Sequence, residues 1–368
     1  MSSLSAPRAF RSAISEATVA SILDRLRTAR WPVLPDVPDP RSGPDPQRLR
    51  RLVAYWIADY DWAATETAIN EWPQFIATVE GLDIHFRHVR SGTGGYPLIL
   101  THGWPGSFLE FDAVIEPLLN AGFDLVIPSI PGFTYSAKPP GPIGPKRIAG
   151  LWRRLMTDHL GYRRFGAQGG DWGSEVSTWL GADHSDVVTG IHLNMVSGWR
   201  LPPNASPEAL AWRRAMSAVR SEAFGYHAVQ STRPLTLSYA LSDSPLGFAA
   251  WGIEKFEQWS DPGCEISDDA LVTALMVHLV NDATGSMSWI YAGHRHEAAL
   301  ESGAIRVETP TAVARFAHDF FPQPPRSMVE DRYRVVRWTE MDRGGHFAAM
   351  EAPEALSRDI VAFFRELQ

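Results

Sequence analysis

Short apolar runs that end in glycine or proline recur from Tyr96 onwards, and each is followed by a stretch whose apolar residues have helical spacing. The runs are YPLILTHGWPG, FDLVIPSIPGF, RRFGAQGG and VVTGIHLNM. Strands that alternate with helices form parallel sheets, and helices cover both faces of such sheets. The pattern therefore predicts an α/β fold with a mostly parallel sheet that is covered by helices.

Two parts of the chain depart from this alternation. Residues 1–80 combine helical spacing, as in SEATVASILDRL, with the proline-rich WPVLPDVPDPRSGPDP, which predicts helices and a meander around the core. The sheet is expected to begin after them, at GLDIHFRHVR. Residues 198–296 are helical, aromatic and interrupted by prolines, which predicts an insertion. The core is then expected to comprise residues 81–197 and 297–368.

Composition narrows the class of protein. The chain has 368 residues, of which 45% are hydrophobic, and this is enough for a sizeable core. Its net charge of -8 and the lack of a long Lys/Arg run argue against a nucleic-acid partner. The N-terminal sequence has no long apolar stretch and Cys264 is the single cysteine, so we expect no membrane span, no secretion signal and no intrachain disulfide. A cytoplasmic protein is predicted.

The heptapeptide QGGDWGS, residues 168–174, has the spacing of a strand–nucleophile–helix turn. Gly169, Asp171 and Gly173 fit the pattern G-x-nucleophile-x-G, in which a strained backbone holds the central side chain outward beside a helix N-terminus. An aspartate there is already anionic and can attack a saturated carbon of an epoxide or an alkyl halide, giving an ester. The alternative is an aspartate that only caps the helix.

Two further motifs occur at positions in the chain that would allow them to form one site with Asp171. HGWPGS follows a buried-looking strand and brings the backbone N–H groups of Gly103 and Trp104 into a loop, which makes it a candidate oxyanion hole. RGGHFAAME places His346 after a strand and two glycines, just before the last helix. A structural histidine would not need this order of oxyanion loop, nucleophile turn, insertion and histidine.

Together these segments resemble the α/β-hydrolase fold, and within it the microsomal-type epoxide hydrolases that carry an epoxide-hydrolase N-terminal region. The resemblance runs from about Phe10 to the C-terminus and rests on HGWPGSFLEF, GGDWGS, HLNM, ALSDSPLGFAAWGIEKF and RGGHFAAMEAPE. It implies that residues 1–80 wrap the core as a meander and that residues 198–296 form a helical lid.

The resemblance also implies catalytic roles. Asp171 matches the nucleophile, and His346 matches the base that activates water to hydrolyse the ester. Two lid tyrosines should hydrogen-bond the epoxide oxygen, and Tyr226 and Tyr291 stand at the matching places. Tyr239 is the competing tyrosine.

The acid that orients His346 is assigned to Asp319 in TPTAVARFAHDFFPQPP. This segment departs from the commoner family pattern, because residues 317–318 are Ala-His where a proline is often found. Asp342 is the local alternative, only four residues before His346. A residue in the same short loop is poorly placed to reach the far side of the ring, so Asp319 is preferred.

Tryptophans complete the predicted site. The backbone N–H groups of Trp104 and Trp172 should meet the oxyanion of ester hydrolysis, and the side chains of Trp104, Trp172 and Trp289 are predicted substrate contacts. His294 and His296 form HRH, but two histidines without a third ligand are a weak metal signal, and both are expected to face solvent.

The sequence thus predicts an epoxide hydrolase that opens a small hydrophobic epoxide with water, through an aspartyl ester, to a vicinal diol, without metal or organic cofactor. A haloalkane-type dehalogenase and a ligand-binding homologue without turnover remain alternatives. A serine esterase is disfavoured because the nucleophile turn has no serine. The identity of the epoxide, its regio- and enantiopreference, the formation of a homo-oligomer and a role in detoxification or secondary metabolism are left open.

Overall fold

The computed structural model describes residues 6–33, 40–92, 94–196, 201, 205–297 and 305–368. Within them, nine strands form one sheet in the order β1-β2-β3-β5-β4-β6-β7-β8-β9. The strands are β1 (Arg8–Phe10), β2 (Gln74–Val79), β3 (Leu82–Val89), β4 (Tyr96–Thr101), β5 (Phe123–Pro128), β6 (Phe165–Gly169), β7 (Val188–Leu193), β8 (Val307–Phe316) and β9 (Tyr333–Met341).

The sheet is parallel from β5 to β9 and antiparallel from β1 to β5. Every residue of β5 and β6 is buried, as expected for strands covered on both faces. The prediction of a mostly parallel sheet is confirmed.

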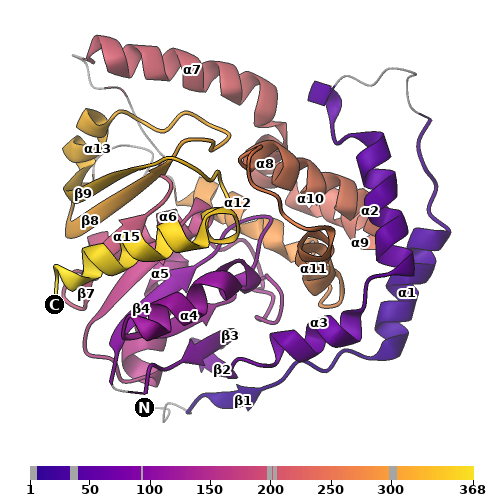
Figure 1. Cartoon of the computed structure of the whole chain (residues 1–368), viewed down its shortest axis with the longest axis horizontal. Helices are drawn as coiled ribbons and strands as arrows, with labels where there is room; N and C mark the ends of the chain where they lie inside the picture. The colour runs from indigo at the N-terminus through magenta and orange to yellow at the C-terminus, as the bar shows by residue number, and fades with distance from the viewer. Residues whose placement is uncertain (1–5, 34–39, 93, 197–200, 202–204, 298–304) are drawn as a thin grey trace.

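Helices cover both faces of the sheet. In Figure 1, α4 (Asp112–Asn120) and α15 (Pro353–Arg365) lie together in front of it. On the other face α5 (Pro145–Arg154) packs beside α6 (Asp171–Asp183), which contacts β4, β6, β7 and β8. Shorter pieces complete the core: a helical turn at Phe108–Phe111, another at Leu155–His159, α13 (Arg326–Arg332) and α14 (Ala348–Glu351). This arrangement places the carboxyl ends of β4 and β6 at one edge.

The N-terminal region contains helices, as predicted, and it also contributes two strands to the sheet, which was not predicted. Residues 34–39 of the proline-rich segment lie outside the described residues. The region contains α1 (Glu16–Arg27), a short turn at Pro40–Ser42, α2 (Pro46–Ala58) and α3 (Trp62–Ile69), but β1 and β2 pair antiparallel at the sheet edge. The sheet therefore does not begin at GLDIHFRHVR, as the sequence had predicted. The turn from β2 to β3 has positive φ at both Glu80 and Gly81, the backbone of a tight hairpin turn.

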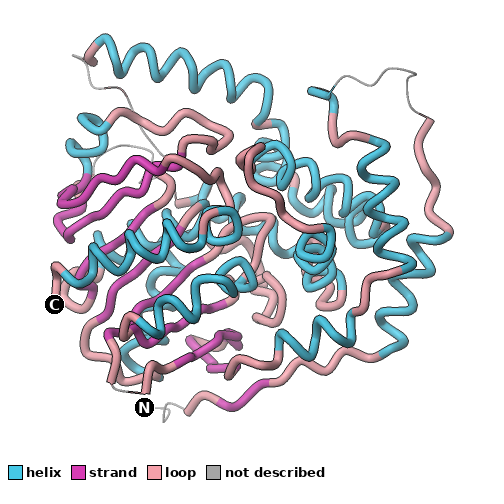
Figure 2. The backbone as a smooth tube through the Cα atoms, viewed as in Figure 1, coloured by secondary structure: helices cyan, strands magenta, loops and turns pink. Residues whose placement is uncertain are grey.

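The stretch between β7 and β8 contains helices and no strand within its described residues, as the tube in Figure 2 shows. Two of its helices begin at a serine followed by proline. Ser206 and Ser244 each accept a hydrogen bond from the third residue of the helix that follows, which caps its N-terminus. The helices are α7 (Pro207–Ala223), α8 (Gly225–Thr232), α9 (Pro234–Asp243), α10 (Pro245–Trp259), α11 (Asp268–Leu279), a turn at Ser286–Ser288 and α12 (Trp289–His296).

The first boundary predicted for this insertion, between residues 197 and 198, lies outside the described residues. The second agrees with the end of α12 at His296. Helices α10 and α11 contact α2, and α10 also contacts α1, so the N-terminal helices and the insertion lie side by side. No described helix is both long and apolar enough to span a bilayer.

Candidate active site

The turn between β6 and α6 holds Asp171 in a strained conformation. Asp171 has a φ of 45°, in the left-handed region that non-glycine residues seldom adopt. A Cβ at Gly169 would lie 2.2 Å from the carbonyl carbon of Gly173, and a Cβ at Gly173 would lie 1.8 Å from the backbone oxygen of Thr101. Only glycine fits at these two positions, so the glycines of GGDWGS allow β6, α6 and the end of β4 to meet closely.

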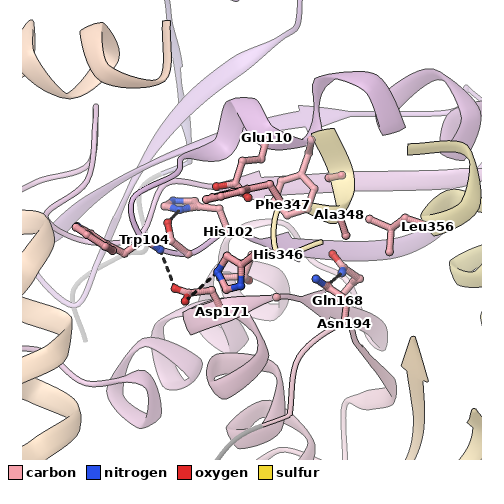
Figure 3. A pocket seen from close by; sticks show the side chains of 15 residues that line it. His102, Trp104, Glu110, Gln168, Asp171, Asn194, His346, Phe347, Ala348 and Leu356 are labelled. Atoms are coloured by element: carbon pink, nitrogen blue, oxygen red, sulfur yellow. Dashed lines mark hydrogen bonds and ion pairs between the residues drawn. The ribbon is translucent and has the colours of Figure 1, made fainter. Parts of the chain in front are cut away.

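The loop after β4 closes over the Asp171 carboxylate. The backbone N–H of Trp104 donates to Asp171 Oδ1 over 2.8 Å, as the dashed line in Figure 3 marks. A Cβ at Gly103 would lie 2.2 Å from the same oxygen, which explains the glycine there. The other predicted donor, the N–H of Trp172, makes no hydrogen bond to this carboxylate within the described chain. Trp104 thus holds one of the two carboxylate oxygens, Oδ1.

Glu351 fixes the loop that carries His346. Its carboxylate accepts the backbone N–H of Gly345 over 2.9 Å and that of Phe347 over 2.8 Å, on either side of the histidine. The N–H of His346 itself donates to the carbonyl oxygen of Trp259 at the end of α10. The ring is buried, with 7% of the residue exposed, and packs edge-on against the Trp259 indole. This packing leaves the imidazole little freedom to rotate.

The imidazole of His346 lies between two carboxylates. Its Nδ1 is 3.1 Å from Asp319 Oδ1, and its Nε2 is 3.4 Å from Asp171 Oδ2. The side chain of Asp319, in the loop after β8, is buried, whereas Asp342, the local alternative for the acid, is exposed. The structure therefore brings Asp171, His346 and Asp319 together in the order that the sequence predicted.

These carboxylates decide the charge of the ring. Burial favours the neutral imidazole, but the nearby charges of Asp319 and Asp171 outweigh it and raise the pKa of His346 from 6.5 to about 10. The resting site then contains an imidazolium between two aspartates at neutral pH.

Two buried tyrosines from the insertion lie close to the turn between β6 and α6 that holds Asp171, which we call the elbow. Tyr226 of α8 stacks on the Trp104 indole with ring centroids 5.2 Å apart, and Tyr291 of α12 meets the Trp172 ring edge-on at 4.7 Å. The two phenol rings are 6.0 Å apart. Burial, together with the charge of Asp171, raises the pKa of both phenols well above the usual value, so both remain protonated donors.

Asp171 and the two tyrosines line a cavity of about 690 Å³. Its walls come from α6, α7, α8, α12 and the loop after β8, and most of the side chains are apolar or aromatic, among them Trp172, Met216, Phe224 and Phe320. A cavity of this size and lining suits a mainly hydrophobic small molecule.

Two predictions for α12 need correction, and one alternative falls away. Trp289 is half-buried and does not line either cavity beside Asp171, because it precedes Tyr291 by two residues and so lies about 200° from it around the helix. His294 does not face only solvent, since it is half-buried, lines the large cavity and packs against Trp172. Tyr239, the competing tyrosine, is 82% exposed.

Sequence reasoning assigned no role to several polar residues beside the elbow. A second cavity, of about 20 Å³, is lined by the polar residues Asp171, His346, Thr101, His102, Glu110, Gln168 and Asn194, together with apolar neighbours (Figure 3). Glu110 and Gln168 are inside the quoted motifs HGWPGSFLEF and QGGDWGS, which is the signal that could have pointed to them. Across the described ranges, no group of three or more His, Cys, Asp or Glu side chains is arranged to hold a metal ion.

Comparison with known proteins gives a consistent result. The chain matches the family described as "Epoxide hydrolase N terminus" over residues 7–111 and the "alpha/beta hydrolase fold" family over residues 96–226. Epoxide hydrolase 1 of Sus scrofa is 32% identical, over 98% of this chain and 89% of its own length. Juvenile hormone epoxide hydrolase 2 of Ctenocephalides felis is also 32% identical, over 96% and 84% respectively.

A solved structure agrees with these relatives. The epoxide hydrolase of Aspergillus niger superposes with a TM-score of 0.89 at 28% identity, and the match covers 100% of this chain and 98% of that one. Because sequence similarity of this extent reaches from the N-terminal region through the elbow to the last helix, the chain is an enzyme of the α/β-hydrolase fold and belongs to the epoxide hydrolase family.

Proposed function

We propose that this enzyme opens a hydrophobic epoxide to a vicinal diol through a covalent ester on Asp171. The observation that supports it most is the juxtaposition of a carboxylate on a strained turn with two buried phenols, Tyr226 and Tyr291, on the wall of one cavity. Helices α7 to α12 act as the lid, because they supply both phenols. A cytoplasmic location stays a prediction from composition.

Ring opening begins with the negatively charged carboxylate of Asp171 as the nucleophile. Oδ2 of Asp171 attacks an epoxide carbon, and the C–O bond of the ring breaks to give an alkoxide. Tyr226 and Tyr291 donate hydrogen bonds to that oxygen, and one of them gives up its proton. Because the phenols are buried and fixed, they stabilise charge where it develops without reorganising.

Formation of the ester then lowers the pKa of His346. Once Asp171 is a neutral ester, one of the two charges that raise the pKa of His346 is gone, so the imidazolium can release its proton. This proton passes to the tyrosinate and restores the phenol that protonated the alkoxide. His346 is now a neutral base, still oriented by Asp319 through Nδ1.

Hydrolysis restores the enzyme. Neutral His346 takes a proton from water as the water oxygen bonds to the ester carbon, and the N–H groups of Trp104 and Trp172 meet the oxyanion. The bond between the ester carbon and Oδ2 breaks, and the diol leaves with that oxygen and takes the proton that His346 had accepted. The other proton of the attacking water then passes from the carboxyl group of Asp171 to His346, which restores the imidazolium. The carboxylate of Asp171 now contains the oxygen of the water.

The test begins with turnover of aryl and alkyl epoxides beside matched alkyl halides. We expect diol formation from epoxides, none from Asp171→Ala, and an enzyme heavier by one substrate in intact-mass spectra of His346→Gln. Preferential turnover of the halides would favour the dehalogenase alternative.

Isotope labelling separates this route from direct hydration. In a single turnover of wild type in heavy-oxygen water, the first diol should contain ordinary oxygen taken from Asp171, and the label should appear in the protein. Label found wholly in the first diol would exclude the ester.

A further inference from the structure

The cavity of about 20 Å³ beside Asp171 and His346 has the size of a water site. A water molecule needs roughly 10–15 Å³ of such space, so this cavity can hold water but not an epoxide substrate. It is distinct from the large cavity of about 690 Å³, although Asp171 borders both. Its polar lining and its position next to the elbow point to a function in the reaction.

Two buried polar atoms on the wall of this cavity lack a protein partner. Thr101 Oγ1 and Gln168 Oε1 make no hydrogen bond to any described residue, and these residues are 0% and 1% exposed. His346 also lines this cavity, and its Nε2 faces Asp171 Oδ2 over 3.4 Å. Buried polar atoms are nearly always paired, and ordered water is the usual partner where protein groups are missing. The amide nitrogen of Gln168 already donates to Asn194 over 2.8 Å, which fixes the amide and leaves its oxygen as an acceptor.

Glu110 brings a carboxyl group to the same cavity. The side chain occupies space that Gly106 leaves open, since a Cβ at Gly106 would lie 1.3 Å from Glu110 Oε1. Burial raises the pKa of this carboxyl to about 8, with a further rise from the charge of Asp171 and an opposing effect of His346. At neutral pH the group is therefore mainly protonated and can donate a hydrogen bond.

We infer that this cavity holds the water that hydrolyses the Asp171 ester, and that Glu110 positions this water for His346. The water donates one O–H to Gln168 Oε1 and the other to the neutral Nε2 of His346, and it accepts from Thr101 or from Glu110. Its oxygen then bonds to the ester carbon and its proton passes to Nε2; the bond between that carbon and the diol oxygen breaks, and the diol oxygen takes this proton from His346. This inference rests on the proposed function.

Measuring the two half-reactions separately tests the role of Glu110. In rapid-mixing single turnovers, Glu110→Ala should form the alkyl-enzyme at a rate within about twofold of wild type but hydrolyse it roughly 10- to 100-fold more slowly, as expected when a reacting water is misplaced. Alkylated enzyme should therefore accumulate in intact-mass spectra. Glu116→Ala, at an exposed position on α4, is the matched control and should leave both rates unchanged.

Two other variants probe the cavity without removing Glu110. Gly106→Ala places a methyl group where the Glu110 carboxyl now lies and displaces it, and Thr101→Val removes the unpaired hydroxyl at nearly constant shape. Both should slow hydrolysis more than alkylation. Normal hydrolysis in Glu110→Ala and Thr101→Val, or equal slowing of both half-reactions, overturns the water site. Wild type that forms no alkyl-enzyme with any epoxide contradicts the proposed function instead.

Discussion

Replacing Asp171 with asparagine should lower the pKa of His346, because the amide removes a negative charge as the ester does. In the structure Nε2 of His346 is 3.4 Å from Asp171 Oδ2, and Nδ1 is 3.1 Å from Asp319 Oδ1. The rise of the pKa from 6.5 to about 10 corresponds to roughly 5 kcal/mol in favour of the imidazolium, at about 1.4 kcal/mol per pKa unit.

Coulomb's law gives the share of Asp171. Two unit charges at this separation, with an effective dielectric constant of about 20, attract by roughly 5 kcal/mol, which is as large as the whole net shift. With Asp171 neutral, only Asp319 opposes the burial that favours the neutral ring. The pKa of His346 in Asp171→Asn is therefore expected near or below its ordinary value.

The assay is an NMR titration of protein with isotopically labelled histidine. Among the 12 histidines, the signal of His346 is identified as the one that disappears in His346→Gln. It should titrate near pH 10 in wild type and near or below neutrality in Asp171→Asn. The same pKa in both proteins, or a wild-type transition near 6.5, would refute the proton release that we propose for the ester.

The same shift predicts a dependence of stability on pH. The folded pKa of His346 lies above the unfolded value, so its contribution is fully present below about pH 6.5 and is lost as the pH rises to about 10. Over that range this group should lower the free energy of unfolding of wild type by up to about 1.4 kcal/mol per pH unit. Denaturant unfolding at a series of pH values should show a smaller slope for Asp171→Asn, and equal slopes would contradict the assigned pKa.

Further predictions concern the phenols and the elbow. Tyr226→Phe and Tyr291→Phe should each slow alkylation roughly tenfold in single turnovers, and the double variant roughly 1,000-fold, because each phenol partly replaces the other. Tyr239→Phe, at an exposed position, is the control. Normal alkylation by the double variant would show that the phenols take no part in the mechanism. Gly173→Ala should cost roughly 3 kcal/mol or more of stability, since its Cβ would lie 1.8 Å from a backbone oxygen of β4. Gly141→Ala, which meets no atom within 4 Å, should leave the Tm nearly unchanged, and an equal Tm for both variants would contradict the close packing.

Local patterns in the sequence predicted the elements and the catalytic centre. The elbow comprises only the five residues from Gly169 to Gly173. Because its geometry depends on this short segment, the spacing of Gly169, Asp171 and Gly173 was enough to predict it. The alternation of apolar runs with helical stretches likewise predicted the parallel part of the sheet. Resemblance of motifs to a family then indicated His346 and Asp319, which no local spacing connects with the elbow.

Pairing and side-chain direction were decided by the tertiary structure. β1 has only three residues, too few for a detectable alternation, and it joins the sheet because β2 offers it an edge more than 60 residues later. The orientation of α12 in the fold places His294 on the side of the helix that lines the large cavity, and Trp289 on another side.

The charge of His346 and the water cavity also depend on the tertiary structure. The pKa of His346 depends on carboxylates at positions 171 and 319, which are distant from it in sequence and near it only in the folded chain. The unpaired atoms of Thr101 and Gln168 belong to the neighbouring strands β4 and β6, and they lie near the His346 ring only in the folded chain. Electrostatic and hydrogen-bonding energies follow distance in space, so a sequence can supply these groups, but only the fold determines which of them interact.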